Sequence, residues 1–92
     1  MIKIVYRKYS VKIEDIIKTF KIEGSVSSVL LDGVYLVIKT SLQDSTVVYK
    51  ICPREFMTKF QWKGDDGKFI SQESTNVIVV VEVTEMFLEG DT

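Results

Sequence analysis

The fold is decided by residues 25–52, which read SVSSVLLDGVYLVIKTSLQDSTVVYKIC. Two runs rich in β-branched and aromatic residues, 25–31 and 34–42, flank the dipeptide Asp32-Gly33. This dipeptide between two such runs is the strongest short hairpin signal, because a type I′ turn needs two positive φ angles. A second turn at Gln43-Asp44-Ser45 leads to a third run, 46–52. The stretch is therefore predicted to be a three-stranded antiparallel meander.

The residues before the meander predict one strand and one helix. Residues 2–8 alternate between apolar and charged side chains, with Ile2, Ile4 and Tyr6 on one face, which is typical of a strand. Residues 11–22 are predicted to be helical, because apolar side chains recur at helical spacing: Ile13, Ile16, Ile17 and Phe20. Ser10 is placed to cap this helix and Gly24 to end it.

The residues after the meander predict a second helix and a buried strand. Pro53 suits the first turn of a helix over 53–63, where its missing N–H costs nothing. A short strand at 68–70 and a polar loop at 71–76 follow, and residues 77–84 form the last strand. The run Val77 to Val81 is apolar on both faces, as in strands covered on both sides. The tail after Leu88 is polar, and we expect it to be frayed.

These elements predict a single α+β domain over residues 1–92. Its core is a mainly antiparallel sheet of five to six strands with two short helices, in the order β-α-β-β-β-α-(β)-β. The length of 92 residues leaves no room for a second domain. The 46% of hydrophobic residues and single proline exclude a disordered chain. The sequence contains no Ala, the best helix former, which also weighs against an all-helical protein.

Two short helices can cover one face of such a sheet but not both. We therefore expect an apolar patch on the uncovered face, with the interface candidates Tyr35, Val37, Val48 and Val80. Exposed patches of this kind usually mark association. A homo-oligomer or a protein partner is the predicted occupant. The alternative is that the two helices lie on opposite faces and leave nothing apolar exposed.

The charges are unevenly distributed along the chain. Residues 1–21 carry a net charge of +4 and residues 65–92 a net charge of −6. The basic end predicts nucleic-acid binding as a second possibility, with the candidates Arg7, Lys8, Tyr9 and Lys12, because cations can hold phosphates and aromatic rings can stack on bases. The alternative is that the two ends pair as neighbouring strands, so that Glu82 meets Lys3 and Arg7.

The composition excludes most catalytic chemistry. The chain has no His, the usual acid–base residue at neutral pH, and only one Cys. Cys52 has no His partner and is expected to be a small core residue. Asp65-Asp66-Gly67 is first of all a turn, and Trp62 is expected to fill the core. We therefore predict no enzyme activity, no catalytic residues, no metal site and no cofactor.

Cellular location is predicted from what the sequence contains. A single Cys cannot form an internal disulfide, which favours a reducing compartment. The apolar stretch at residues 1–4 is short and is interrupted by the charged Lys3, so it does not resemble a signal peptide. The longest apolar run, Val77 to Val81, is far too short to span a membrane. The expected location is the cytoplasm, with no membrane association.

About half of the chain, from Ser27-Ser28 to Gln72, resembles the KTSC domain, a small family named for the C-terminal extension of some lysyl-tRNA synthetases. The resemblance lies in Ser27-Ser28, in Val47-Val48-Tyr49-Lys50-Ile51-Cys52-Pro53 and in Gly67-Lys68-Phe69. Ile51 stands where the family has a second Tyr, and Asp66 where it has a small residue. The resemblance implies a stand-alone bacterial or phage protein, with RNA binding suspected for the family.

Taken together, these observations predict a small non-enzymatic binding module that acts through protein–protein contacts. An adaptor or inhibitor, including an accessory protein of a phage or other mobile element, fits this description. The alternative is an RNA- or DNA-binding protein that uses the basic strand–helix segment at 1–21.

Overall fold

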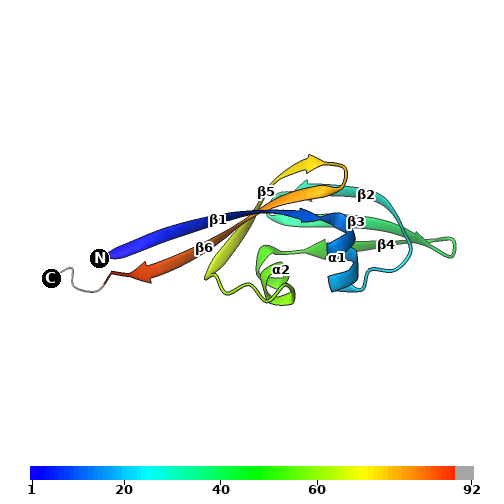
Figure 1. Ribbon diagram of the computed structural model, residues 1–92. Helices are drawn as coiled ribbons and strands as arrows, with labels where there is room; N and C mark the ends of the chain where they lie inside the picture. The colour runs from blue at the N-terminus through cyan, green and yellow to red at the C-terminus, as the bar shows by residue number, and fades with distance from the viewer. Residues whose placement is uncertain (89–92) are drawn as a thin grey trace.

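The computed structural model describes residues 1–88, which form six strands and two helices (Figure 1). In chain order the elements are β1 (Ile2–Lys12), α1 (Ile13–Phe20), β2 (Ser25–Asp32), β3 (Tyr35–Leu42), β4 (Ser45–Ile51), α2 (Pro53–Lys59), β5 (Asp66–Ser74) and β6 (Val77–Phe87). The α+β class and the predicted order of elements are confirmed, including the strand before the last one. The predicted frayed tail after Leu88 lies outside the described residues.

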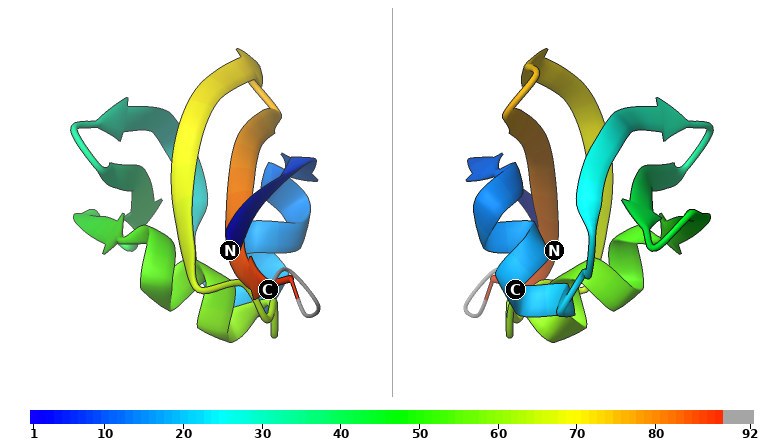
Figure 2. Two further views of the ribbon diagram at one scale, coloured as in Figure 1. Left: turned by 90° about the vertical axis from the view of Figure 1, so that its left-hand side faces the viewer. Right: turned by 90° about the vertical axis from the view of Figure 1, so that its right-hand side faces the viewer.

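The strands form two antiparallel sheets of three, in the orders β1-β6-β5 and β2-β3-β4. The prediction of one sheet with five to six strands is therefore wrong. β2 and β5 lie side by side where the two sheets meet (Figure 2). Register shifts interrupt both strands, at Val26/Ser28 in β2 and at Phe69/Ser71 and Gln72/Ser74 in β5. Because a bulge bends a strand and breaks its ladder, these two edges do not join into a continuous sheet.

Both helices lie on the same side of the two sheets (Figures 1 and 2). We call this side the inner face and the opposite side the outer face. The core lies between the helices and the inner face, and its fully buried members are Ile16, Leu36, Ile38, Phe56, Ile78 and Val80. The alternative in which the helices cover opposite faces is wrong, because α1 and α2 share this one core.

Aromatic rings hold the two helices together. The fully buried Phe56 of α2 stacks on Phe60 at 4.5 Å and meets Phe20 of α1 at 6.0 Å between ring centroids. Trp62 lies edge-on to Phe56 at 5.5 Å and stacks on Tyr9 of β1 at 4.4 Å. The expectation that Trp62 packs in the core is confirmed.

The helices are shorter than predicted. Ser10 does not cap α1, because it lies within β1, where its Oγ donates to the Glu73 carboxylate at 3.3 Å. Lys12 occupies the N-cap position without a side-chain hydrogen bond. α1 ends at Phe20 because Lys21 adopts the left-handed conformation, with φ 54°, three residues before Gly24. α2 ends at Lys59, four residues before the predicted end.

The two hairpins of the meander are confirmed, but the turn types differ from the prediction. Asp32 pairs with Tyr35, so the first turn is centred on Gly33 and Val34. Of these two only Gly33 has a positive φ, 60°, as in a type II′ turn. The second turn carries two positive φ angles, 46° at Gln43 and 62° at Asp44, which is the type I′ pattern.

β1, β5 and β6 are longer than the sequence indicates. β5 continues to Ser74 through most of the predicted polar loop, and β6 continues to Phe87. The resulting molecule is elongated, with extents of 63 × 21 × 20 Å. At its far end the Leu88 amide donates a hydrogen bond to the Met1 carbonyl at 3.1 Å. The first and last described residues therefore lie side by side.

Candidate protein-interaction surface

β1 and β6 continue beyond the rest of the molecule as an arm, which we define as residues 1–5 and 84–88. The last pair between β5 and β6 joins Asp66 to Val83. From that point outward β6 pairs only with β1, and the arm projects away from both helices (Figure 1). It is a two-stranded ribbon without a third strand or a helix behind it. In water such ribbons are only marginally stable by themselves.

The outer face of the arm is apolar and exposed. Directly paired residues share a face in an antiparallel ladder. The pairs on this face are Ile2 with Phe87 and Ile4 with Glu85, followed at the base of the arm by Tyr6 with Val83. Phe87 is 79% exposed, Tyr6 68%, Ile2 54% and Ile4 49%. Glu85 is the only charged member of the three pairs.

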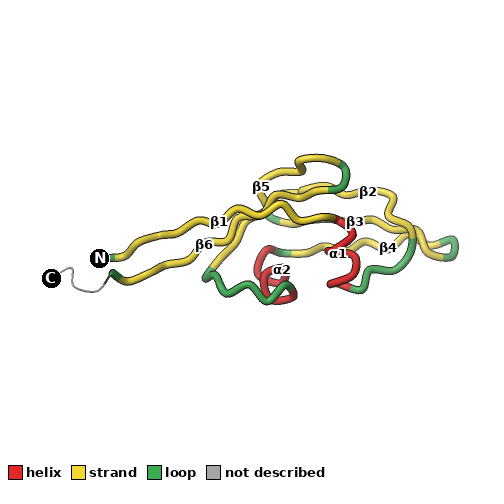
Figure 3. Tube along the Cα trace, viewed as in Figure 1, coloured by secondary structure: helices red, strands yellow, loops and turns green. Residues whose placement is uncertain are grey.

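The other face of the arm adds further apolar side chains near the tip. Met1, Met86 and Leu88 are all exposed, whereas Lys3, which is paired with Met86, supplies a charge. Single exposed apolar residues are normal on soluble proteins, but a contiguous group of this size usually marks an interaction site. Six of the thirteen exposed large apolar side chains among the described residues lie in the arm, which Figure 3 shows as two strands that extend beyond both helices.

A groove lies on the outer face where the arm joins the rest of the molecule. Its volume is about 590 Å³, and we call it the outer groove; its lining residues are Tyr6, Lys8, Asp66, Lys68, Ile70, Val81 and Val83. Val81 forms the centre of a row, with Lys8 paired to it on β1 and Lys68 paired to it on β5. The groove therefore has an apolar floor with a lysine on each side.

The four predicted interface residues do not form one patch. Val80 is fully buried and packs in the core, so its assignment to an interface is wrong; its pairs Tyr9 and Phe69 also face inward. Val37 does point to the outer face, but its cross-strand neighbours Leu30 and Lys50 cover it to 8% exposure. Tyr35 is half-buried beneath the Lys50 ammonium, 4.2 Å from the ring centroid. Val48 alone is freely exposed.

The predicted nucleic-acid residues are divided between the two faces of β1. Lys8 and Lys12 are exposed on the outer face, whereas Arg7 and Tyr9 lie on the inner side. Tyr9 stacks on Trp62 and donates its hydroxyl to Glu82 at 3.1 Å, so its ring is part of the packed interior. The structure brings Lys8 and Lys68 together around the outer groove.

Glu82 joins the two chain ends and the segment before β5. It is 6% exposed and lies opposite Arg7 in the ladder, which confirms that the basic and acidic ends pair as neighbouring strands. The expected contact of Glu82 with Lys3 is wrong, because Lys3 pairs with Met86 in the arm. Its Oε1 accepts the Tyr9 hydroxyl, and its Oε2 accepts the Gly64 amide at 2.8 Å. A buried carboxylate with these partners is a structural element of the fold.

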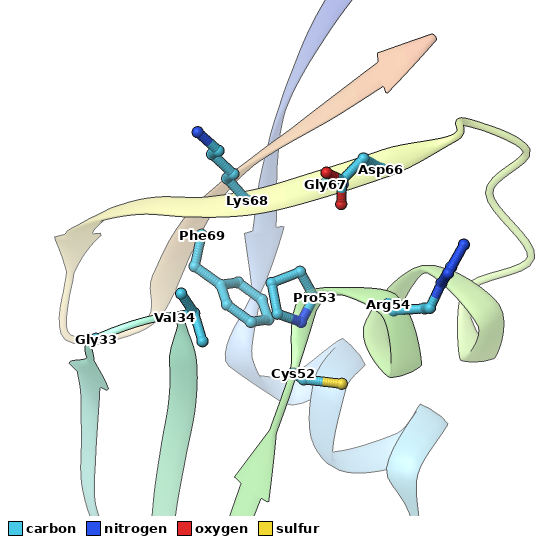
Figure 4. A pocket seen from close by; sticks show the side chains of 9 residues that line it. All are labelled: Gly33, Val34, Cys52, Pro53, Arg54, Asp66, Gly67, Lys68 and Phe69. Atoms are coloured by element: carbon cyan, nitrogen blue, oxygen red, sulfur yellow. The ribbon is translucent and has the colours of Figure 1, made fainter.

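A second cleft of about 490 Å³ lies between the first turn of the meander, the start of α2 and β5 (Figure 4). Cys52 lines it and is half-buried, so its expected place in the core is wrong: the helix begins directly after it and leaves it at the rim. In Figure 4 the Arg54 and Lys68 side chains extend away from each other. The Asp66 carboxylate already accepts the Gly67 amide at 2.8 Å. The cleft therefore gathers no convergent set of reactive groups.

Two further findings concern the described residues 1–88. No group of three or more potential metal ligands occurs among them. Neither helix has the length or the apolar character to cross a bilayer.

The exposed residues of the arm were not predicted as a site, although the sequence contains a signal for them. Apart from Val5, the apolar positions of β1 are even-numbered up to Tyr6 and odd-numbered from Tyr9 to Val11. Since side chains alternate between faces, this change of phase means that the apolar face of the strand switches from the outer to the inner side. The switch occurs where the arm meets the core.

Comparisons with known proteins give no relative for this chain: no family model, no curated protein and no solved structure matches it. The resemblance to the KTSC domain stays a prediction.

Proposed function

We propose that this protein is a non-enzymatic binding module that acts through protein–protein contacts, with the outer face of the arm as its docking surface. The observation that carries the proposal is the exposure of Phe87 at the tip of the arm and of Tyr6 at its base, on a ribbon that no other element within residues 1–88 covers. Aromatic residues are enriched at the centres of protein interfaces because they bury a large area at low entropic cost. Roles as an adaptor or an inhibitor fit this mode of action.

The energetics support a partner for the arm. Full burial of a large apolar side chain contributes about 1.5–3 kcal/mol relative to its exposure. Four such side chains on one face supply enough favourable free energy to offset part of the cost of association, which is itself several kcal/mol. Docking would also stabilise a two-stranded ribbon that is only marginally stable by itself.

A site-specific photo-crosslinker tests this proposal. Benzoylphenylalanine at position 87 is expected to give protein adducts when the chain is irradiated in the cells that make it. The matched control carries the same group at Thr46, an exposed position near the N-terminal end of β4. Equal adduct yields at positions 87 and 46, or none at either, would contradict the proposal.

RNA or DNA binding is the alternative, and the two exposed lysines Lys8 and Lys68 beside the outer groove favour it. Binding driven by phosphates weakens steeply as salt is added, whereas apolar docking does not. Replacement of Arg7, Lys8 and Lys12 by Glu would then abolish retention on a nucleic-acid column. Unchanged retention, or none in the native protein, removes this alternative.

A further inference from the structure

We propose that the partner of the arm is a second copy of this chain, which docks outer face to outer face so that each arm covers the outer groove of the other copy. The inference rests on the proposed function, because it names the occupant of the same surface. It follows from the row spacing, the charges and the exposed area of this surface.

The spacing of rows along β1 and β6 makes the arm and the groove complementary under two-fold symmetry. We call directly paired residues of neighbouring strands a row. The two-fold axis of the pair lies between the two facing sheets, perpendicular to the strands, at the Tyr6–Val83 row. Rows at equal distances on either side of this axis then face each other. The Ile4–Glu85 row of one copy then faces the Lys8–Val81 row of the other. The Ile2–Phe87 row lies about 7 Å farther along, at 3.3–3.4 Å per residue, and faces the Ser10–Val79 row of the other copy. This row lies beyond the Lys8–Val81 row, on the side of the groove toward Ile70.

The charges fit this arrangement. Glu85 is the only charged residue on the outer face of the arm, and in the symmetric pair it lies above Val81 of the other copy. Lys8 and Lys68 flank Val81 on the two neighbouring strands. Each carboxylate therefore lies between two ammonium groups, and the dimer contains two such contacts. Asp66, the acidic residue of the groove, pairs with Val83 and therefore lies in the row at the axis, where it faces Asp66 of the other copy. This one pair of like charges opposes association, whereas the dimer contains two favourable Glu85 contacts; each Asp66 carboxylate also accepts the Gly67 amide of its own copy at 2.8 Å.

The exposed area is close to what a reversible dimer needs. Ile2, Ile4, Tyr6 and Phe87 each leave about half or more of their surface exposed, on the order of 100 Å² per side chain. With the groove, each copy would bury about 500 Å², and the pair about 1,000 Å², which is the lower bound for a specific interface. An interface of this size predicts a dimer in exchange with its monomer.

Edge-to-edge pairing of two β1 strands is a weaker arrangement. The free edge of β1 carries Lys3, Arg7 and Lys8. Several antiparallel registers place two of these cations opposite each other, which destabilises the pair. Lysines on edge strands are a common means of preventing such pairing.

Charge reversal in both partners provides the decisive experiment. Glu85→Lys places a lysine against Lys8 and Lys68, and the double variant Lys8→Glu/Lys68→Glu places glutamates against Glu85. By sedimentation equilibrium from about 1 μM to about 1 mM, each variant alone is expected to dimerise at least ~10-fold more weakly than the native chain. In the heterodimer both contacts are complementary, so an equimolar mixture is expected to regain association to within ~3-fold.

Controls separate this interface from misfolding and from general charge effects. Glu55→Lys makes the same change of charge on the exposed surface of α2 and is expected to leave dimerisation unchanged. Trp62 fluorescence verifies that each variant keeps its packed core. Phe87→Asp is expected to abolish dimerisation in any mixture.

Three results would overturn the inference: a native chain that stays monomeric over the whole range, a dimer that Glu85→Lys does not weaken, or variants that the mixture does not restore. A monomer whose position 87 still crosslinks to a different protein would refute the second copy as partner and leave the proposed function standing. A monomer without any adduct at position 87 would refute both.

Discussion

The same two strands, β1 and β6, run through two regions that share one hydrogen-bond ladder but differ in their neighbouring elements and in the burial of their side chains. In the body of the molecule, residues 6–83, they have β5 beside them and the helices beneath, and Ile78 and Val80 are fully buried. In the arm they pair only with each other, and their apolar side chains are exposed. Burial in this protein therefore depends on whether a third element covers a strand pair, more than on how apolar the strands are.

The largest effect is expected in the body, at the ring that joins the helices. Phe56→Ala removes a fully buried side chain that meets four other aromatic rings. The lost burial and the cavity should lower the free energy of unfolding by about 3–5 kcal/mol. Denaturant titration followed by Trp62 fluorescence measures this change. A loss below about 1 kcal/mol would show that the body is not packed as described.

A smaller effect is expected where the body meets the arm. Glu82→Ala leaves the Tyr9 hydroxyl and the Gly64 amide without their shared acceptor, at a cost of about 1–3 kcal/mol. Glu82→Gln retains a carbonyl acceptor and should lose less. Thermal unfolding of the two variants compares them, and equal losses would mean that the hydrogen bonds do not explain the residue's burial.

Two substitutions in the turns of the meander are expected to change the free energy of unfolding in opposite directions. Gln43→Gly relieves a non-glycine residue at φ 46°, and should stabilise the protein by about 0.5–1 kcal/mol. Gly33→Ala places a side chain at φ 60°, where nothing lies near the added carbon, and should destabilise it by about 1 kcal/mol. Chemical denaturation of both variants should give changes of opposite sign. Two changes of the same sign would refute the turn assignments.

The smallest effect on stability is expected in the arm. Ile4→Thr keeps a β-branched side chain at a position that is 49% exposed and lies outside the core, so the free energy of unfolding of the monomer should change by less than about 0.5 kcal/mol. Arm amides should exchange hydrogen faster than those of the body strands in dilute solution. Protection of the arm in a demonstrated monomer would remove the contrast between the two regions.

The sequence predicts most of the elements because their signals are local. Hydrophobic periodicity identifies both helices, and turn residues identify the meander, with boundaries that differ from the structure by a few residues. The division into two sheets is not predictable in the same way. It depends on bulges in β2 and β5 that become visible only when both strands are paired with their neighbours.

The candidate site is less predictable than the fold, because exposure depends on long-range packing. Val80 and Phe87 belong to the same apolar strand, yet one is fully buried and the other is 79% exposed. Both residue types are strongly apolar, so hydrophobicity does not distinguish the buried residue from the exposed one. What distinguishes them is that β5 and the helices lie beside one and not the other. The prediction of an uncovered sheet face agrees with the position of both helices on one side of the sheets. Of its four residues, however, Val80 is fully buried and Val37 is 8% exposed, and the exposed apolar residues of the arm are not among them.

The hydrogen bond between Leu88 and Met1 at the tip of the arm has a practical consequence for work with this protein. An affinity tag or fluorescent protein fused ahead of Met1 would begin beside the proposed docking surface and could be tested for obstructing it. A circular permutant avoids this difficulty, since a short linker can close the tip and new ends can open at the Gln43–Asp44 turn, on the opposite end of the molecule. Such a variant would hold the arm as a closed hairpin and leave the tip free of any fused tag or domain.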